Sequence, residues 1–356
     1  ERYPRRKFIK RFVKGLVSIM AFPSIPAMLF ARSSKTPLTM NTDKANNHST
    51  RESRRSPSYL QLHSNGELKR RGKILWQKME ICDICPRECN KNRLKGQKGD
   101  CGATAQLEVS SAHPHFGEER PLVMDGGSGT VFFTHCCMRC VYCINYEISI
   151  LGQGRAYSIQ DLAHMMLRLQ EMGCENINVV TPTHYVPHIV LALDIACEKG
   201  LSIPLVYNTS GFENLETLRL LEGIVDIYLP DFKYSQSAMA AKYSEGARTY
   251  PEKVKAALLE MQRQVGVAHP ASDGKMYRGL MIRHLVLPNN VSGTQTVIKW
   301  IASHLPKDTY INLMSQYMPT YKADDYPQIS RRITKEEYNQ AIQYARQVGL
   351  SNVEIQ

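Results

Sequence analysis

The sequence lacks the features of a nucleic-acid-binding protein, although its formal net charge is +12. It contains no known nucleic-acid motif and no basic patch interleaved with aromatic residues. The charge is also concentrated at one end, because residues 1–55 hold 13 lysines and arginines against three acidic residues and the remainder is nearly neutral. A basic tail is more often a targeting signal or an anchor than a nucleic-acid-binding element. We therefore expect no nucleic-acid partner.

The basic tail lacks an uninterrupted apolar run and a clean A-x-A cleavage site. Pro23 and Pro26 break the mostly apolar stretch at residues 15–31, so a stable spanning helix is not expected. The run RRKFIK at residues 5–10 nevertheless resembles a twin-arginine export motif. Residues 1–32 are therefore predicted to be a twin-arginine-like signal or a basic anchor, which favours a periplasmic or membrane-associated protein. The alternative is a disordered basic tail on a cytoplasmic protein.

The ten cysteines lack the even distribution of a disulfide framework, since seven of them fall into two tight groups. The first group lies in a segment predicted to span residues 76–125 and consists of Cys82, Cys85, Cys89 and Cys101. Four thiolates within twenty residues can enclose one metal completely, and the glycines of KGQKGDCG allow the necessary turns. Such closure suits structural zinc or a second Fe–S cluster. Four reduced thiols in a loop-rich cap are the alternative.

The second group lacks a fourth ligand. Cys136, Cys140 and Cys143 have the spacing C-x-x-x-C-x-x-C directly after a strand-like stretch. A [4Fe–4S] cluster normally takes four thiolates, so three leave one iron open, and an open metal position is where chemistry occurs. Two other readings of the same residues remain. Cys137 gives the frame C-x-x-C-x-x-C, closer to a ferredoxin, and His135 with the cysteines suits structural zinc.

Strand-like and helix-like stretches alternate from Gly126 onward. Residues 33–75 before the cysteines read as a linker followed by one or two helices. The predicted strands are 129–135, 176–181, 202–207, 225–229, 280–287 and 309–314, and the predicted helices are 158–173, 186–199, 215–221, 252–264, 293–304 and 334–348. This alternation predicts a parallel sheet with right-handed crossovers. Six units are too few for a closed eight-fold barrel, so residues 126–356 are predicted to form an α/β fold, a partial (βα)6 TIM-like barrel.

Polar residues follow nearly every predicted strand, at the carboxyl end where barrel enzymes carry their chemistry. They include His184, Asn208, Ser210, Asp231 and Lys233, and the predicted strand 280–287 itself carries Arg283. Three structural alternatives stay open: Asp231 and Lys233 as an exposed turn pair, Arg283 as a structural salt bridge, and His184 as a rim histidine with its hydrogen bonds satisfied. A further polar set, His113, His115, Glu118 and Glu119, is interpreted as exposed loop residues, with a site beside the four-cysteine group as the alternative.

These motifs together resemble the radical SAM superfamily, and within it a group similar to pyruvate formate-lyase activating enzyme. The resemblance runs from about residue 80 to the end, through CDICPREC, GSGTVFFTHCCMRCVYCINYEIS, VVTPTHYVP, VYNTSGFE, VDIYLPDFKY, RHLVLP and MSQYMP in order. It implies a radical SAM core with a [4Fe–4S] cluster on Cys136, Cys140 and Cys143. The cluster would reductively cleave S-adenosylmethionine to a 5′-deoxyadenosyl radical for hydrogen abstraction. A reductant such as flavodoxin or ferredoxin and an unknown substrate are implied as partners, with activation of a glycyl-radical enzyme as one role.

The resemblance also implies binding roles for S-adenosylmethionine. Asp231 and Lys233 match the Asp-x-Lys element that contacts the methionine part, and Tyr142 is expected near the adenine. Asn208 and Ser210 suit ribose or carboxylate groups, and Arg283 suits a carboxylate. The sequence departs from the group at residues 181–183, where Thr-Pro-Thr replaces Gly-Gly-Glu, and at His135, Cys137 and Ile144 beside the cysteines, where related chains tend to have glycine, asparagine and glutamine. An iron–sulfur electron carrier or cluster-stabilised binding protein without S-adenosylmethionine chemistry is the alternative function.

Overall fold

The structure is a computed structural model that describes residues 56–355, all within one compact unit. The predicted signal or anchor at residues 1–32 and most of the predicted linker lie outside the described residues. Within residues 56–355, every helix is too short or too polar to cross a membrane.

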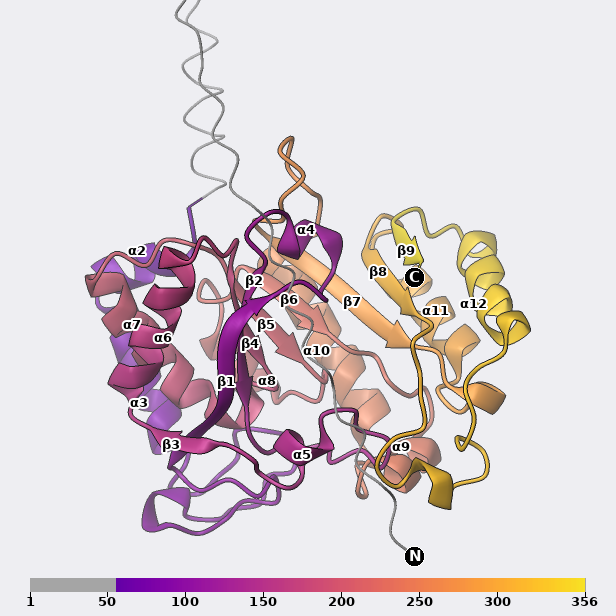
Figure 1. Cartoon of the computed structure of the whole chain (residues 1–356), viewed down its shortest axis with the longest axis horizontal. Helices are drawn as coiled ribbons and strands as arrows, with labels where there is room; N and C mark the ends of the chain where they lie inside the picture. The colour runs from indigo at the N-terminus through magenta and orange to yellow at the C-terminus, as the bar shows by residue number, and fades with distance from the viewer. Residues whose placement is uncertain (1–55, 356) are drawn as a thin grey trace, which may run out of the picture. The chain divides into compact units, whose positions relative to one another are not determined.

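A nine-stranded sheet forms the centre of the fold, in the order β3-β1-β2-β4-β5-β6-β7-β8-β9 (Figure 1). Its strands are β1 (Leu107–His115), β2 (Ser128–Phe133), β3 (Arg155–Tyr157), β4 (Ile177–Val180), β5 (Leu205–Thr209), β6 (Ile227–Pro230), β7 (Gly279–Leu285), β8 (Tyr310–Met314) and β9 (Val353–Ile355). Neighbouring strands from β2 to β9 pair in parallel, whereas β1 is antiparallel to both β2 and β3. The sheet curves without closing, so the predicted α/β fold with a partial barrel is confirmed.

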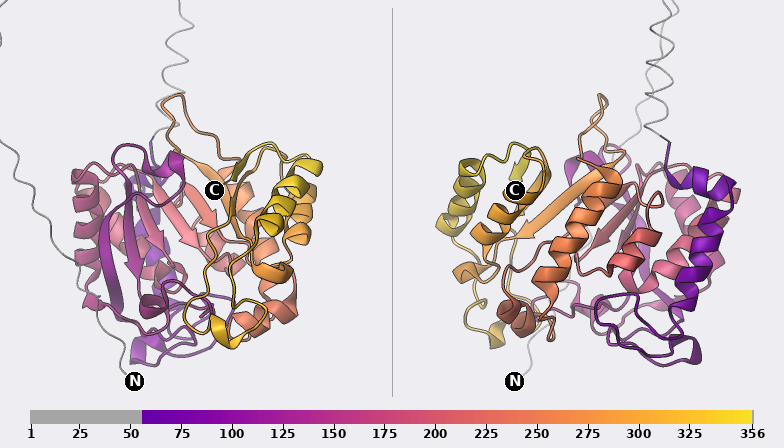
Figure 2. Two further views of the ribbon diagram at one scale, coloured as in Figure 1. Left: turned by 45° about the vertical axis from the view of Figure 1, so that its right-hand side comes forward. Right: turned by 180° about the vertical axis from the view of Figure 1, so that it is seen from behind.

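Helices follow the parallel strands and cover the outer face of the sheet (Figure 2). The α-helices are α2 (Tyr59–Ser64), α3 (Glu67–Gln77), α4 (Arg120–Val123), α5 (Tyr146–Ser149), α6 (Ile159–Glu171), α7 (Val186–Glu198), α8 (Leu215–Leu220), α9 (Ser237–Tyr243), α10 (Tyr250–Val265), α11 (Thr294–His304) and α12 (Lys335–Gln347). Short 3-10 turns lie at η1 (Arg93–Lys95), η2 (Thr183–Tyr185), η3 (Pro288–Asn290) and η4 (Ala323–Asp325). Capping boxes begin α6 at Ser158 and α12 at Thr334, as their sequences predict.

The two faces of the parallel strands bury different sets of side chains. Residues such as Tyr207 and Tyr228 face the helices in the main core. On the opposite, inner face, a second apolar cluster contains Val206, Leu229, Met281 and Tyr310, together with Leu122 from α4. Because side chains on one face recur every second residue, the next inward positions are polar. They are Asn208, Asp231, Arg283 and Asn312, which form a polar layer just beyond the apolar cluster toward the carboxyl ends of the strands.

Three strands were not predicted. β1 falls inside the predicted four-cysteine segment and adds an antiparallel strand to one edge of the barrel sheet. β3 extends that edge, and β9 extends the other. The connection from β1 to β2 carries α4, whose Leu122 joins the inner apolar cluster, and Pro121 accepts a hydrogen bond from the Met276 amide at 3.0 Å. This connection therefore covers the amino-terminal end of the barrel.

Candidate functional site

The three-cysteine loop begins where β2 ends, as predicted. Backbone hydrogen bonds hold it at both ends: the His135 amide donates to Ile148 at 3.1 Å, and the Val141 amide donates to Tyr243 at 3.0 Å. His135 and Arg139 have φ values of 67° and 47°. Such left-handed conformations suit glycine, the residue that the resemblance leads us to expect at the position of His135.

Each of the three cysteine sulfurs has at least one hydrogen-bond partner. The Met138 amide donates to Cys136 Sγ at 3.3 Å. Ser244 Oγ lies 3.0 Å from Cys140 Sγ, and Ser149 Oγ lies 3.1 Å from Cys143 Sγ. Burial raises the pKa of Cys140 and of Cys143. The hydrogen bonds and the nearby Lys233 act in the opposite direction and favour the thiolate.

Cys137 lies between the two cysteine groups. Hydrogen bonding with its thiol lowers the pKa of both Cys136 and Cys85, and the same contacts, together with burial, raise the pKa of Cys137 well above its usual value. Of these two neighbouring thiols, Cys136 therefore loses its proton more readily than Cys137. This arrangement favours the frame with Cys136, Cys140 and Cys143 as ligands over the ferredoxin-like frame.

The donor set fits an iron–sulfur cluster better than a single metal ion. Within residues 56–355, no three histidine, cysteine or carboxylate side chains converge closely enough to share one ion as they stand. Thiolates around a [4Fe–4S] cluster each bind a different iron and need only surround it. Cys136 acts on the pKa of both Cys140 and Cys143, and Lys233 acts on the pKa of all three, so the three sulfurs lie near one another as such a cluster requires.

In the first group Cys82, Cys85 and Cys101 are buried, and Cys89 is half-buried. Gly99 separates Cys89 from Cys101 so closely that a Cβ at Gly99 would lie 3.4 Å from both sulfurs. Burial raises the pKa of Cys101 to about 12, and the neighbouring thiols of Cys85 and Cys82 add to that rise. As they stand, these four sulfurs do not converge closely enough to share one metal ion, so zinc or a second cluster at this place stays a prediction.

Arg93 joins this segment to the barrel. Its side chain is fully buried, and its guanidinium donates to the Thr104 carbonyl at 2.8 Å and to the His184 carbonyl at 2.8 Å. It also lies 3.9 Å from Cys82 Sγ. A positive charge therefore lies beside the first cysteine group, where it stabilises thiolates.

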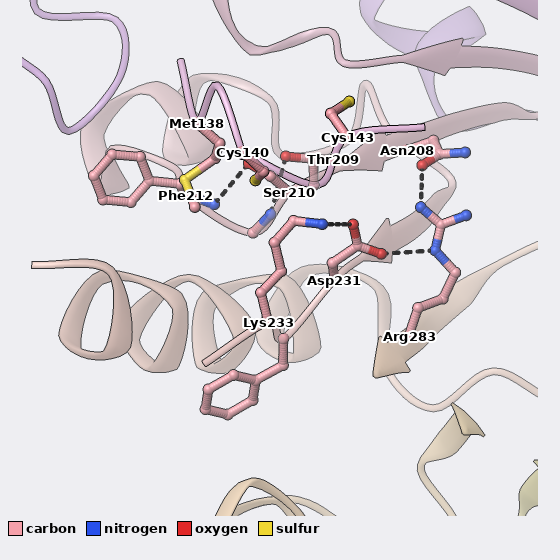
Figure 3. Close-up of polar contacts among 12 residues, drawn as sticks. Met138, Cys140, Cys143, Asn208, Thr209, Ser210, Phe212, Asp231, Lys233 and Arg283 are labelled. Atoms are coloured by element: carbon pink, nitrogen blue, oxygen red, sulfur yellow. Dashed lines mark hydrogen bonds and ion pairs between the residues drawn. The ribbon is translucent and has the colours of Figure 1, made fainter. Parts of the chain in front are cut away.

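Asp231 and Lys233 lie at the carboxyl end of β6 and form a mostly buried ion pair of 2.7 Å (Figure 3). The other oxygen of Asp231 accepts from Arg283 Nε at 2.9 Å. Burial raises the pKa of Asp231, but the two cations more than offset it and hold the pKa below its usual value. Burial likewise lowers the pKa of Lys233, but Asp231 and the Cys140 sulfur outweigh it and raise the pKa. The interpretation as a solvated turn pair is therefore wrong.

The other predicted cofactor-binding residues are held by the chain itself. Arg283 donates to Asn208 at 2.5 Å, and Asn208 donates to Glu118 at 3.2 Å. The Ser210 hydroxyl accepts from the Phe212 amide at 3.4 Å. Tyr142 is buried, and its hydroxyl lies 2.7 Å from that of Tyr234, which contacts Ser244 at 2.9 Å. Tyr142 therefore belongs to a hydrogen-bonded chain that ends at Cys140.

Glu118 and Glu119 are not exposed loop residues, contrary to the sequence interpretation. Both enter the barrel from the connection between β1 and α4. Glu118 Oε2 lies 3.3 Å from Arg283, and Glu119 Oε1 accepts from Asn312 at 2.9 Å. Burial raises the pKa of Glu118, although Arg283 acts in the opposite direction. Two carboxylates in a glycine-flanked loop give no periodic signal, so the sequence alone could not place them inside.

Glu213 is a third buried carboxylate that the sequence did not indicate. It accepts hydrogen bonds from Thr183 at 2.7 Å, from Thr209 and from Tyr207 at 3.4 Å. Burial raises its pKa to about 7, even though these donors lower it. Glu213 ties together the ends of β4 and β5 just behind the cysteine loop.

Comparisons with known proteins agree with this geometry. The family described as the radical SAM superfamily matches residues 130–267. The uncharacterized protein MJ0674 of Methanocaldococcus jannaschii is 30% identical over 279 residues, which cover 76% of this chain and 75% of the relative. Among solved structures, methylornithine synthase (PylB) is 12% identical with a TM-score of 0.41, covering 62% of this chain and 68% of that chain. That structural likeness is too distant to bear on function.

Proposed function

Because the chain belongs to the radical SAM superfamily, we propose that it is an enzyme that cleaves S-adenosylmethionine to abstract hydrogen from a substrate. Cys136, Cys140 and Cys143 would hold the [4Fe–4S] cluster. When bound, the cluster supplies the electron that breaks the carbon–sulfur bond of S-adenosylmethionine. The observation that carries the proposal is the meeting of these three thiols with the buried Asp231–Lys233 pair at one end of the barrel.

The roles of the surrounding side chains follow from their contacts. Once Cys140 and Cys143 are thiolates, Ser244 and Ser149 would donate to their sulfurs and so stabilise the form needed for iron binding. Lys233 suits the carboxylate of the methionine part, and Asp231 suits its ammonium. An ion pair that is already assembled and mostly buried offers one partner of each sign for an amino acid.

Electron supply and substrate extend the proposal. A flavodoxin or ferredoxin would deliver the electron, and the hydrogen donor would be a small molecule or a protein glycine, as in activation of a glycyl-radical enzyme. Cys82, Cys85, Cys89 and Cys101 would bind zinc or a second cluster. The closeness of Cys89 and Cys101 and the neighbouring Arg93 support a thiolate site there.

The decisive experiment is to incubate the reconstituted, reduced protein with S-adenosylmethionine and measure 5′-deoxyadenosine. We expect turnover in the wild type and in Cys137→Ala, and none in Cys136→Ala, with loss of iron only in the latter. An intact cluster without 5′-deoxyadenosine would favour the electron-carrier alternative. Iron loss in Cys137→Ala but not in Cys136→Ala would show that the ligand frame is wrong.

Lys233→Ala tests the cofactor-binding role separately from the cluster. One charge-assisted hydrogen bond contributes roughly 1.5–3 kcal/mol, so we expect about ten- to a hundredfold weaker binding of S-adenosylmethionine. Titration of the cluster's EPR signal measures the affinity while iron content stays constant. Lys73→Ala, which removes an exposed lysine from α3, is the matched control. Unchanged affinity in Lys233→Ala would assign the ion pair a purely structural role.

A further inference from the structure

The polar layer inside the barrel carries more negative than positive charge. The layer itself contributes Asp231 and Arg283, and Glu118, Glu119 and Lys233 lie beside it, so three carboxylates face two cations. Both oxygens of Asp231 and both of Glu118 have partners within this group. The third carboxylate, Glu119, acts on Arg283 through its charge but makes no direct ion pair within the described part of the chain, so the group keeps one negative charge in excess.

Glu119 and Asn312 also present acceptor atoms without donors. Glu119 Oε1 is occupied by the Asn312 amide at 2.9 Å, but Glu119 Oε2 and Asn312 Oδ1 find no hydrogen-bond partner within residues 56–355. The two residues are only 3% and 1% exposed. A buried acceptor left unpaired costs roughly 1–3 kcal/mol, so two adjacent ones call for an explanation. Both are acceptors, so their missing partner is a donor.

The groups around Glu119 and Asn312 in the described part of the chain add negative charge and offer no free donor. Glu354, on the edge strand β9, accepts from Tyr310, and Glu119 contributes to raising the pKa of its carboxyl after burial. Arg283 interacts with Glu119 through its charge, but its guanidinium already binds Asp231, Glu118 and Asn208. A donor from outside the chain is therefore needed to satisfy Glu119.

We propose that Glu119 and Asn312 bind a positively charged nitrogen of the substrate, an ammonium or a guanidinium. Such a group donates several hydrogen bonds and neutralises the remaining carboxylate in one step. Arg283 and Asp231 separate this position from Lys233, so the proposed group lies deeper in the barrel than the methionine end of S-adenosylmethionine. The inference rests on the proposed function in one respect, because it names this group as part of the substrate. Binding of the group can be measured without turnover.

Small ions of matched size test the inference on the anaerobically reconstituted full chain. The probes are n-butylammonium, n-butylguanidinium and butyrate, measured by calorimetry without S-adenosylmethionine. We expect one or both cations to bind saturably and butyrate not to bind. Glu119→Gln, which keeps the shape of the side chain, should raise the Kd of the cation at least tenfold, whereas the exposed Glu171→Gln on α6 should leave it unchanged.

Further measurements separate the inference from its alternatives. Urea unfolding and iron content verify that Glu119→Gln is folded and loaded. Competition by a blocked lysine peptide, compared with its alanine counterpart, distinguishes a protein side chain from a free amine as the source of the cation. Absence of cation binding, or equal binding by Glu119→Gln, would mean that only water fills the position and would overturn the inference. An equal loss of S-adenosylmethionine affinity in that variant would overturn it too, because the site would then serve the cofactor. Failure of 5′-deoxyadenosine formation with intact cation binding would contradict the proposed function alone.

Discussion

Replacing Arg283 by methionine should destabilise the fold strongly. Arg283 is the cation that contacts Glu118, at 3.3 Å, and one of two that contact Asp231, at 2.9 Å, and all three side chains are mostly buried. Removing one partner of a buried ion pair costs about 3–5 kcal/mol, because the other charge is left without compensation. Arg283→Met should therefore lower the free energy of unfolding by that amount near neutral pH.

The stability difference between Arg283→Met and the wild type should also depend on pH. Burial already raises the pKa of Glu118, and loss of Arg283 raises it further, so the carboxyl takes up a proton in the folded variant as pH falls. A folded-state pKa above the unfolded value means that stability is highest below the unfolded pKa and is lost as pH rises through the folded one. The gap between Arg283→Met and the wild type should consequently be smaller at pH 5 than at pH 8.

Urea unfolding of the cluster-free, reduced protein measures these differences, with two comparison variants. Adding Glu118→Gln to Arg283→Met should restore about 1–3 kcal/mol, because it removes the uncompensated charge. Arg263→Met removes an exposed arginine that binds Glu222 and should cost under about 1 kcal/mol. A cost within 1 kcal/mol for Arg283→Met, or further destabilisation on adding Glu118→Gln, would refute the reasoning.

Two other changes test the framework around the site. Gly211 has a φ of 76°, and a Cβ there would lie 2.5 Å from the Asp231 carbonyl oxygen. Gly246 has a similar φ, but a Cβ there would meet open space. Gly211→Ala should therefore lower the free energy of unfolding by about 1–3 kcal/mol more than Gly246→Ala. Equal effects in urea unfolding would exclude the steric contribution. The Glu213 carboxyl has a folded pKa of about 7, so the free energy of unfolding of the wild type should fall by about 3 kcal/mol as pH rises from 5 to 8. Glu213→Gln removes this titrating group and should flatten the pH dependence of stability over that range. Parallel curves for variant and wild type would contradict this.

The parallel units were predictable because their signals are local. Buried strands such as β4 and β5 are short apolar runs, and the helices after them carry periodic apolar faces with caps at Ser158 and Thr334. Chain order then places residues such as Asp231 and Lys233 at one end of the barrel. The same rule located the three-cysteine loop after β2.

What the sequence did not reveal depends on non-local contacts. β1 begins with the alternation Leu107–Val109 but continues through polar residues to His115, and its pairing with β2 decides its structure. Glu118 and Glu119 lie in a loop that resembles a solvated one, and only the fold of the β1–β2 connection brings them inside. The contact of Cys137 with Cys85 likewise joins residues from two distant segments.

The buried Arg93 makes the four-cysteine segment inseparable from the barrel. Its guanidinium bridges Thr104 of that segment and the His184 carbonyl at the start of η2, so the two parts share an interior hydrogen-bond network. A chain shortened to begin at Leu107 would leave the His184 carbonyl without its donor. Grafting residues 82–101 onto another barrel would in turn leave a buried guanidinium without its acceptor. The four-cysteine segment therefore cannot be exchanged alone between proteins, and a chimaera needs the η2 turn with His184 from the same parent.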